Sequence, residues 1–205
     1  MKRNDLLIYP SLIIFFSLLI FSSCATTGGH SSASSSLTPM ELKNRISISE
    51  ITLLTPDDIK AQSYLGLSGG GRFTIPQIKA EVILINVFST TCPHCRKEAP
   101  NTNKLFQAIE EREDLKGRIK IIGIGTRNTL EDVAEFKKEY NVPFPLFPDK
   151  DMSIFEKLET RGTPTMIGIK ILADGSYSVL FFRAGSIGDV SWFIGFLIEM
   201  ARLDK

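Results

Sequence analysis

Residues 82–100 read VILINVFSTTCPHCRKEAP and join an apolar run to a closely spaced pair of cysteines. The first seven residues are mostly apolar and β-branched, which predicts a strand buried on both faces of a sheet. Pro93 suits the first turn of a helix, and apolar residues at helical spacing continue to about residue 116. The stretch therefore predicts a buried strand that leads directly into a helix, with Cys92 and Cys95 at the junction.

The sequence after this stretch alternates between strand and helix patterns. The expected elements are a strand at 119–124, a helix at 130–140 capped by Thr129, a short strand at 144–147, a short helix at 153–158, strands at 165–172 and 177–182 around an Asp174-Gly175 turn, and a helix at 189–203. This order predicts an α/β fold in which helices cover both faces of a central sheet.

The segment before the central strand has a weaker pattern. Residues 46–54, ISISEITLL, alternate and are expected to form an edge strand. The triple glycine at 69–71 is interpreted as a plain loop, because no strand precedes it and no Lys-Ser/Thr pair follows it as in a phosphate-binding loop.

Length and charge limit the possible functions. The chain has 205 residues, of which 43% are hydrophobic, enough for one compact domain. The formal net charge is only +1. A nucleic-acid-binding protein normally carries a basic stripe or patch, so nucleic acid is not an expected partner.

The N-terminus has the features of an export segment. Lys2 and Arg3 precede an apolar run at 6–21, and Ser22 and Ser23 precede Cys24. We interpret residues 1–23 as a lipoprotein-type signal peptide with Cys24 as the lipidated residue; an uncleaved signal anchor is the alternative. Residues 24–40 form an expected flexible Ser/Gly-rich tether, and residues 41–205 the folded domain. Under both interpretations the folded domain is attached to a membrane and lies on the extracytoplasmic or periplasmic side of that membrane.

Four kinds of chemistry are compatible with a CxxC pair in general. Haem attachment requires His after the second cysteine, but Arg96 follows Cys95. Zinc usually needs four ligands, and the sequence offers no second CxxC and only His30 at a distance. A structural disulfide across two residues would constrain little of the unfolded chain. A redox-active dithiol fits best, with no metal and no organic cofactor.

The position of the pair predicts a division of roles. Cys92 at a helix N-terminus is the expected nucleophile, because the partial positive charge there stabilises a thiolate. Pro93 and His94 lie between the cysteines and are expected to tune the thiol pKa, with Arg96 and Lys97 adding positive charge.

Besides the nucleophile, four residues are expected to complete the site. Cys95 would resolve the mixed disulfide formed with a partner. Glu98, one helical turn further on, is either the acceptor of the Cys95 proton, with a raised pKa, or a solvated acid. Thr163-Pro164 before the strand at 165–172 suggests a cis-proline loop beside the dithiol that binds an extended substrate.

Together, VILINVF-STTCPHCRKEAP, the segment VPFPLFPDKD, the loop RGTPTMIGI and the Asp174-Gly175 turn resemble the thioredoxin superfamily, specifically its TlpA/ResA-like membrane-tethered thiol-disulfide oxidoreductases. The resemblance implies a thioredoxin fold with an inserted strand-helix unit. It also implies that Cys92 attacks, Cys95 resolves, Glu98 is the acid after the motif, and Thr163-Pro164 bind substrate. Protein thiols and disulfides, together with a membrane redox partner, would be the partners.

The direction of electron flow stays open at this point. Thr91 occupies the place where this group usually has Trp, and CPHC is the pair found in DsbA-like oxidants. A thiol-dependent peroxidase, with Thr90 or Thr91 and Arg161 as candidate residues, is the first alternative function. A copper chaperone using Cys92, Cys95 and a histidine is the second.

Overall fold

A computed structural model describes residues 46–203 of the chain. Cys24 and the predicted signal and tether segments lie outside the described residues, so their interpretation stays a prediction.

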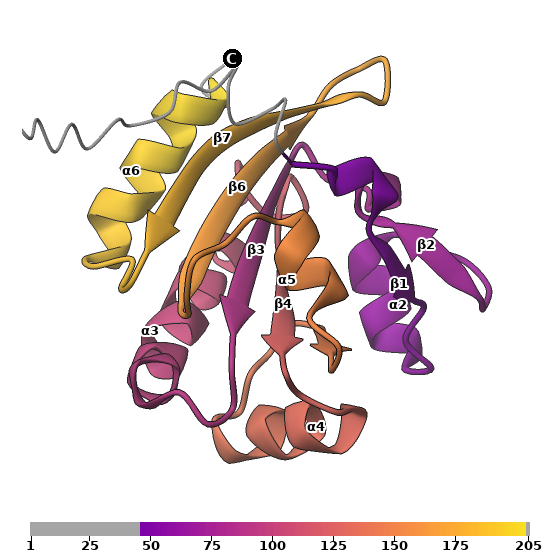
Figure 1. Cartoon of the computed structure of the whole chain (residues 1–205). Helices are drawn as coiled ribbons and strands as arrows, with labels where there is room; N and C mark the ends of the chain where they lie inside the picture. Colours follow the sequence, from indigo (N-terminus) through magenta and orange to yellow (C-terminus); the bar gives the residue numbers. More distant parts are fainter. Residues whose placement is uncertain (1–45, 204–205) are drawn as a thin grey trace, which may run out of the picture. The chain divides into compact units, whose positions relative to one another are not determined.

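A five-stranded mixed sheet forms the centre of the domain, in the order β5-β4-β3-β6-β7 (Figure 1). The central strand β3 (Val82–Phe88) is parallel to β4 (Ile119–Thr126) and antiparallel to β6 (Thr165–Ile171). The edge strands are β5 (Leu146–Asp149), parallel to β4, and β7 (Tyr177–Ala184), antiparallel to β6. The central sheet of the predicted α/β fold is confirmed, and β3 has the predicted bounds.

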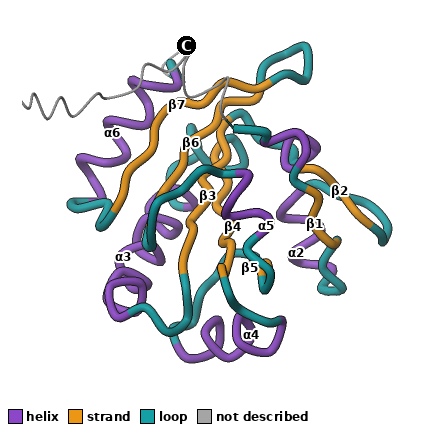
Figure 2. The backbone as a smooth tube through the Cα atoms, in the orientation of Figure 1, coloured by secondary structure: helices purple, strands orange, loops and turns teal. Residues whose placement is uncertain are grey.

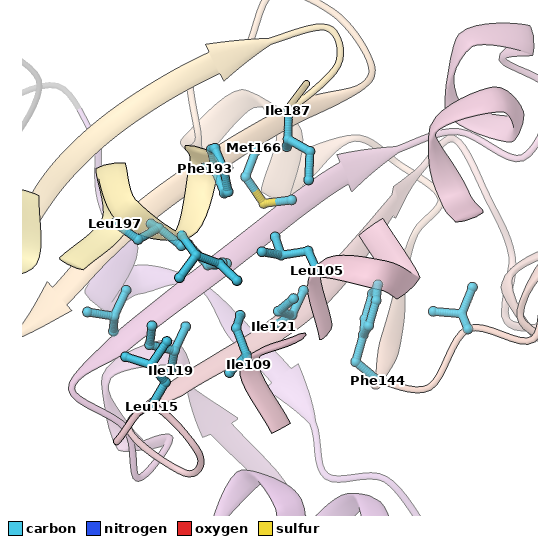
Figure 3. Packing of buried hydrophobic residues seen from close by; sticks show 14 of the residues in the cluster. Leu105, Ile109, Leu115, Ile119, Ile121, Phe144, Met166, Ile187, Phe193 and Leu197 are labelled. Atoms are coloured by element: carbon cyan, nitrogen blue, oxygen red, sulfur yellow. The ribbon is translucent and has the colours of Figure 1, made fainter. Parts of the chain in front are cut away.

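Other elements of the chain pack on both faces of this sheet (Figure 2), and an apolar core lies on each face. On one face, α3 (Pro93–Glu110), α4 (Leu130–Glu139) and α6 (Val190–Ala201) contribute buried side chains. Figure 3 shows part of this core, where residues such as Leu105 and Leu197 meet the sheet. The residues that pack on the other face come from the N-terminal segment and α5 (Ser153–Lys157).

The N-terminal segment differs from the expected edge strand. It begins with a 3₁₀ turn η1 (Ile48–Glu50), and only β1 (Thr52–Leu54) is extended; β1 pairs with β2 (Arg72–Thr74) in a separate two-stranded sheet. A second 3₁₀ turn, η2 (Ile75–Gln77), precedes β3. The predicted single strand over 46–54 is therefore wrong, because Ile48 and Ile51 are buried through a turn rather than through alternation along a strand.

Helix α2 (Ile59–Leu65) was not predicted. The side chain of Asp58 accepts a hydrogen bond from the Lys60 amide at its start, and Gly66 ends it in the left-handed conformation with φ of 70°. Only Leu65 is fully buried within the helix, so the apolar periodicity that identifies a helix in a sequence is weak here.

Tyr64 of α2 covers backbone at the sheet edge. Strand β5 pairs only with the end of β4, from Gly123 onward, so among residues 46–203 no strand lies beside the start of β4 on that side. The Tyr64 hydroxyl accepts a hydrogen bond from the Ile121 amide at 2.6 Å and lies 3.3 Å from the Ile121 carbonyl oxygen, to which it donates. Burial raises the pKa of Tyr64, so the phenol stays protonated and able to donate.

Replacing Tyr64 with phenylalanine is expected to lower the free energy of unfolding by about 1–3 kcal/mol, because a buried amide and carbonyl lose their partner. Urea denaturation of the full chain measures the change. Tyr140→Phe is the matched control, since this side chain is only partly buried and its hydroxyl bonds the exposed side chains of Glu139 and Arg96 rather than strand backbone. Equal stability of the two variants would contradict the role assigned to Tyr64.

Candidate active site

The CPHC pair lies where β3 ends and α3 begins, as predicted. Cys92 is the N-cap residue of α3, Pro93 is its first residue, and Cys95 lies in its first turn. Both cysteines are free thiols in this structure. The side chain of Cys92 is partly exposed, whereas Cys95 is only 3% exposed. A partner protein can therefore reach the first sulfur but not the second.

The surroundings of Cys92 favour its thiolate. Partial burial is the largest single influence and raises the pKa, but several hydrogen bonds together outweigh it. They come from the side chains of Thr163 and Cys95 and from the backbone of Cys95 and His94. The net result is a Cys92 pKa below the ordinary value for cysteine. His94 thus acts through its amide, while its side chain is exposed.

Cys95 has the opposite character. Burial raises its pKa to about 12, and hydrogen bonds with Thr163 and Ser89 offset only part of this effect. The neighbouring Cys92 raises it further. Cys95 is therefore a protonated thiol at neutral pH, and it must lose a proton before it can attack.

These pKa directions predict selective alkylation. In the reduced protein, iodoacetamide should modify Cys92 with a rate that rises with pH and reaches its plateau below the pH expected for ordinary cysteine, since only the thiolate reacts. Cys95 should remain unmodified up to about pH 10, two units below its pKa of about 12. Mass spectrometry of peptides after timed labelling measures both rates. Parallel labelling of the two cysteines across this range would contradict the assignment.

The loop before β6 lies beside the reactive sulfur. The Thr163-Pro164 peptide bond is cis, as the sequence suggested. The Cys92 thiol lies 3.5 Å from the carbonyl oxygen of Thr163, to which it donates. The Pro164 carbonyl accepts a hydrogen bond from the Gly185 amide at 2.8 Å. The structure thus brings together the two predicted motifs, which lie 71 residues apart in the chain.

Glu98 lies on the inner face of α3. Its side chain is 9% exposed, and its Oε1 accepts hydrogen bonds from the Ile187 amide at 2.9 Å and the Asn101 Nδ2 at 3.2 Å. Glu98, Cys95 and Pro164 line the same small pocket, with a volume of about 10 Å³. The alternative prediction, that Glu98 is a solvent-exposed acid, is therefore wrong. Its role in proton transfer stays a prediction.

Arg96 does not act as expected. Its Nε donates to the Thr90 carbonyl at 2.8 Å, and its NH1 lies 3.6 Å from Oε1 of Glu139. The guanidinium therefore supports the backbone before Cys92 and links it to the end of α4. The groups that lower the Cys92 pKa most are the hydrogen-bond donors described above, rather than this cation.

Asn128 is a residue of the site that sequence reasoning missed. Its Oδ1 accepts from the Thr90 amide at 3.0 Å, and its Nδ2 donates to the Thr90 hydroxyl at 2.7 Å. Asn128 is 3% exposed and follows β4, and Thr90 precedes Cys92 by two residues. The only signal in the sequence was a polar residue just after a buried strand, which says nothing about its partner 38 residues away.

The described part of the chain contains neither a cluster of metal-ligating side chains nor a membrane-spanning helix. Within residues 46–203, no group of three or more His, Cys, Asp or Glu side chains is placed to hold a metal ion. No helix in this range is both long and apolar enough to cross a membrane. The apolar run at 6–21 lies outside the described residues.

With the geometry in place, comparison with known proteins gives the family. A model described as the AhpC/TSA family matches residues 57–182, which is more than half of the chain. The chain belongs to the AhpC/TSA family. The match includes the CPHC pair and the cis-proline loop, and it ends within β7.

Curated relatives of this AhpC/TSA protein carry the name thiol-disulfide oxidoreductase ResA, which confirms the predicted ResA-like resemblance. ResA of Halalkalibacterium halodurans is 24% identical over 98 residues, covering 48% of this chain and 53% of the relative. ResA of Bacillus cereus is 29% identical over 96 residues, covering 47% and 53% respectively. The match thus spans about half the length of these curated relatives.

A solved structure confirms the fold. The thioredoxin domain of a thiol-disulfide oxidoreductase from Bacteroides vulgatus superposes with a TM-score of 0.52 at 18% identity, covering 73% of this chain and 95% of that one. The predicted thioredoxin fold is therefore confirmed. Between α3 and β6 the chain forms β4, α4, β5 and α5 in that order.

Proposed function

We propose that this protein is a thiol-disulfide oxidoreductase that exchanges its Cys92/Cys95 dithiol and disulfide with protein substrates. The observation that carries the proposal is the contrast between the two sulfurs. Cys92 is reachable and has a lowered pKa, whereas Cys95 is buried with a pKa of about 12. A reactive sulfur paired with a shielded sulfur allows a mixed disulfide to form on the first and be resolved by the second.

The proposed reduction begins when the Cys92 thiolate attacks one sulfur of a partner disulfide. The partner bond breaks, a mixed disulfide forms on Cys92, and the partner's other sulfur leaves as a thiolate that takes up a proton. Cys95 then loses its proton and attacks the Cys92 sulfur. The mixed bond breaks, the Cys92-Cys95 disulfide forms, and the partner's first sulfur leaves. Two electrons pass to the partner, and oxidation of a partner dithiol is the reverse.

Glu98 is the proposed acceptor of the Cys95 proton. The buried carboxylate and the buried thiol line one small pocket, and a volume of about 10 Å³ corresponds to the space that one water molecule needs. Thr163 and Pro164 are the proposed substrate-binding residues, because Thr163 contacts the sulfur that a substrate must reach. Pro93 holds the first turn of the helix at which this sulfur is presented.

We also propose that the protein is attached to a membrane and faces the periplasm or another extracytoplasmic space, through Cys24 or an uncleaved anchor. The basic residues Lys2 and Arg3 followed by the apolar run at 6–21 support this location. A membrane redox partner would restore the redox state of the dithiol after each exchange. No cofactor beyond the two cysteines is proposed.

The test is a coupled pair of measurements on the full chain. With dithiothreitol as the electron source, the protein is expected to accelerate the reduction of insulin disulfides. Equilibration against glutathione buffers should give a reduction potential above the value of about −270 mV for thioredoxin, because stabilising the Cys92 thiolate stabilises the reduced form. No acceleration of insulin reduction, together with rapid saturable peroxide consumption, would replace this proposal with the peroxidase alternative.

The site geometry gives that alternative little support. The Thr90 hydroxyl accepts a hydrogen bond from Asn128, and the Thr91 hydroxyl lies 3.2 Å from that of Ser89. Arg161 is exposed on the loop before β6. The three candidate residues of a peroxidase site therefore have other contacts or face solvent.

A further inference from the structure

Trp192 is an exposed aromatic residue in a fixed position. It is the only tryptophan in the chain, lies in the first turn of α6, and is 56% exposed. Its ring stacks on Phe196 with centroids 5.5 Å apart and planes 8° apart. The Arg183 guanidinium lies 5.4 Å from the Trp192 ring centroid, in a cation-π contact. We call these three side chains the Trp192 platform.

The Trp192 platform is anchored to the core below it. Phe196 contacts Phe181 at a centroid distance of 5.2 Å and Phe193 at 6.0 Å, and Phe193 is fully buried. Arg183 donates through Nε to the Ser186 carbonyl at 2.9 Å. The exposed indole therefore loses little conformational freedom when another molecule packs on it, which is the property of a binding hot spot.

The loop at 185–189 joins this platform to the dithiol site. Gly185 donates to the Pro164 carbonyl at 2.8 Å, Ile187 donates to Glu98, and the Gly188 carbonyl accepts from Asn101 at 3.0 Å. The Ile187 side chain enters the core beside Met166 and Phe193, as Figure 3 shows. Contacts thus tie the loop to the cis-proline loop and to α3.

The Trp192 platform also lies at the end of the sheet where thiol-disulfide exchange would occur. Arg183 is opposite Met166 in the β6-β7 pairing. Met166 lies two residues after Pro164. In Figure 1 the start of α6 lies toward the same end of the sheet as the start of β6 and the end of β3. Hydrogen bonds and strand pairing therefore connect the platform to the cis-proline loop along this end of the sheet.

Resting on the proposed function, we propose that the Trp192 platform is a docking site for the polypeptide partner in thiol-disulfide exchange. The partner it fits carries an apolar or aromatic side chain a few residues from its cysteine, which packs on the indole. Backbone carbonyl or carboxylate groups next to that side chain would accept hydrogen bonds from the Arg183 guanidinium. Small disulfides without a polypeptide chain would not use the platform.

The test compares two disulfide substrates on the full chain with dithiothreitol as reductant: insulin, a polypeptide, and bis(2-hydroxyethyl) disulfide, a small aliphatic molecule. Trp192→Ala is expected to lower kcat/KM for insulin by about tenfold, mainly through KM, and to leave the small disulfide unchanged. Trp192→Phe should recover most of the insulin rate. Met200→Ala is the matched control, because Met200 is an exposed apolar residue two turns further along the same helix face.

Each outcome separates this proposal from the proposed function. If the wild-type chain reduces neither substrate, the proposed function fails. If it reduces both and Trp192→Ala leaves the insulin kcat/KM unchanged, or lowers both substrates equally, the docking site is overturned while the oxidoreductase stands. A third outcome combines two results: Trp192 fluorescence of the wild-type chain shifts to the blue on phosphatidylglycerol vesicles, and Trp192→Ala has unchanged insulin kinetics. This outcome would overturn the docking site and assign the platform to a membrane surface.

Discussion

Replacing Cys92 with serine is expected to reduce disulfide exchange with insulin by at least about a thousandfold, to the uncatalysed rate. Serine keeps the size and position of the side chain, but its hydroxyl remains protonated at neutral pH and forms no disulfide. Cys95 cannot take over the attack, because it is 3% exposed and has a pKa of about 12. Turbidity of reduced insulin chains, followed with dithiothreitol as reductant, measures the rate.

The chain provides its own control for this substitution. Cys24→Ser removes the third cysteine, which lies outside the folded part that the structure describes, and should leave the rate of insulin reduction unchanged. Retention of the wild-type rate by Cys92→Ser would mean that another group performs the exchange. The assignment of Cys92 as nucleophile would then be withdrawn.

Replacing Cys95 with alanine is expected to stop the reaction at the mixed disulfide. Cys92 can still attack a partner, but no second thiol is present to release it. The variant should therefore retain one partner polypeptide per Cys92 through a bond that dithiothreitol breaks. Non-reducing electrophoresis and intact-protein mass spectrometry measure this species. Alanine suits the buried position because it leaves no unpaired polar group.

A double variant is the control for trapping. Cys92→Ser combined with Cys95→Ala should capture no partner, because the attacking sulfur is absent. Efficient turnover by Cys95→Ala alone, with no dithiothreitol or other small thiol present, would show that a second partner thiol resolves the intermediate. That result would remove Cys95 from the proposed cycle and leave a single-cysteine mechanism.

The central fold could be predicted because its signals are local. The run VILINVF predicted β3 from its first residue to its last, and Asp174-Gly175 predicted the turn between β6 and β7. Element ends were less accurate: α3 ends at Glu110 rather than near residue 116, where turns stabilised by bonds such as that from the Lys116 amide to the Arg112 carbonyl replace the helix. Segment 46–80 was predicted poorly, since its buried residues have neither helical nor strand periodicity.

In the candidate site, too, residues marked by a local motif could be predicted, whereas contacts that depend on tertiary packing could not. Cys92, Cys95 and the Thr163-Pro164 loop could be found because a motif marks each of them, and the structure places them together. The contacts of Asn128 with Thr90 and of Glu98 with Ile187 depend on how distant segments pack. Arg96 was predicted to lower the thiol pKa because of its charge near the motif. In the structure its guanidinium contacts the Thr90 carbonyl and Glu139 instead.

The pair of hydrogen bonds between Asn128 and Thr90 has a consequence for partner choice. The backbone that leads to Cys92 is fixed against the loop after β4, so the attacking sulfur has little freedom to search for its target. In-line displacement at sulfur requires three sulfur atoms in a row, and here the incoming molecule must supply the movement that achieves this alignment. Proteins whose cystines lie in mobile or unfolded segments would therefore react faster than those whose cystines are rigidly packed. A rigid active site would in this way favour substrate proteins whose disulfide-bonded segments are flexible.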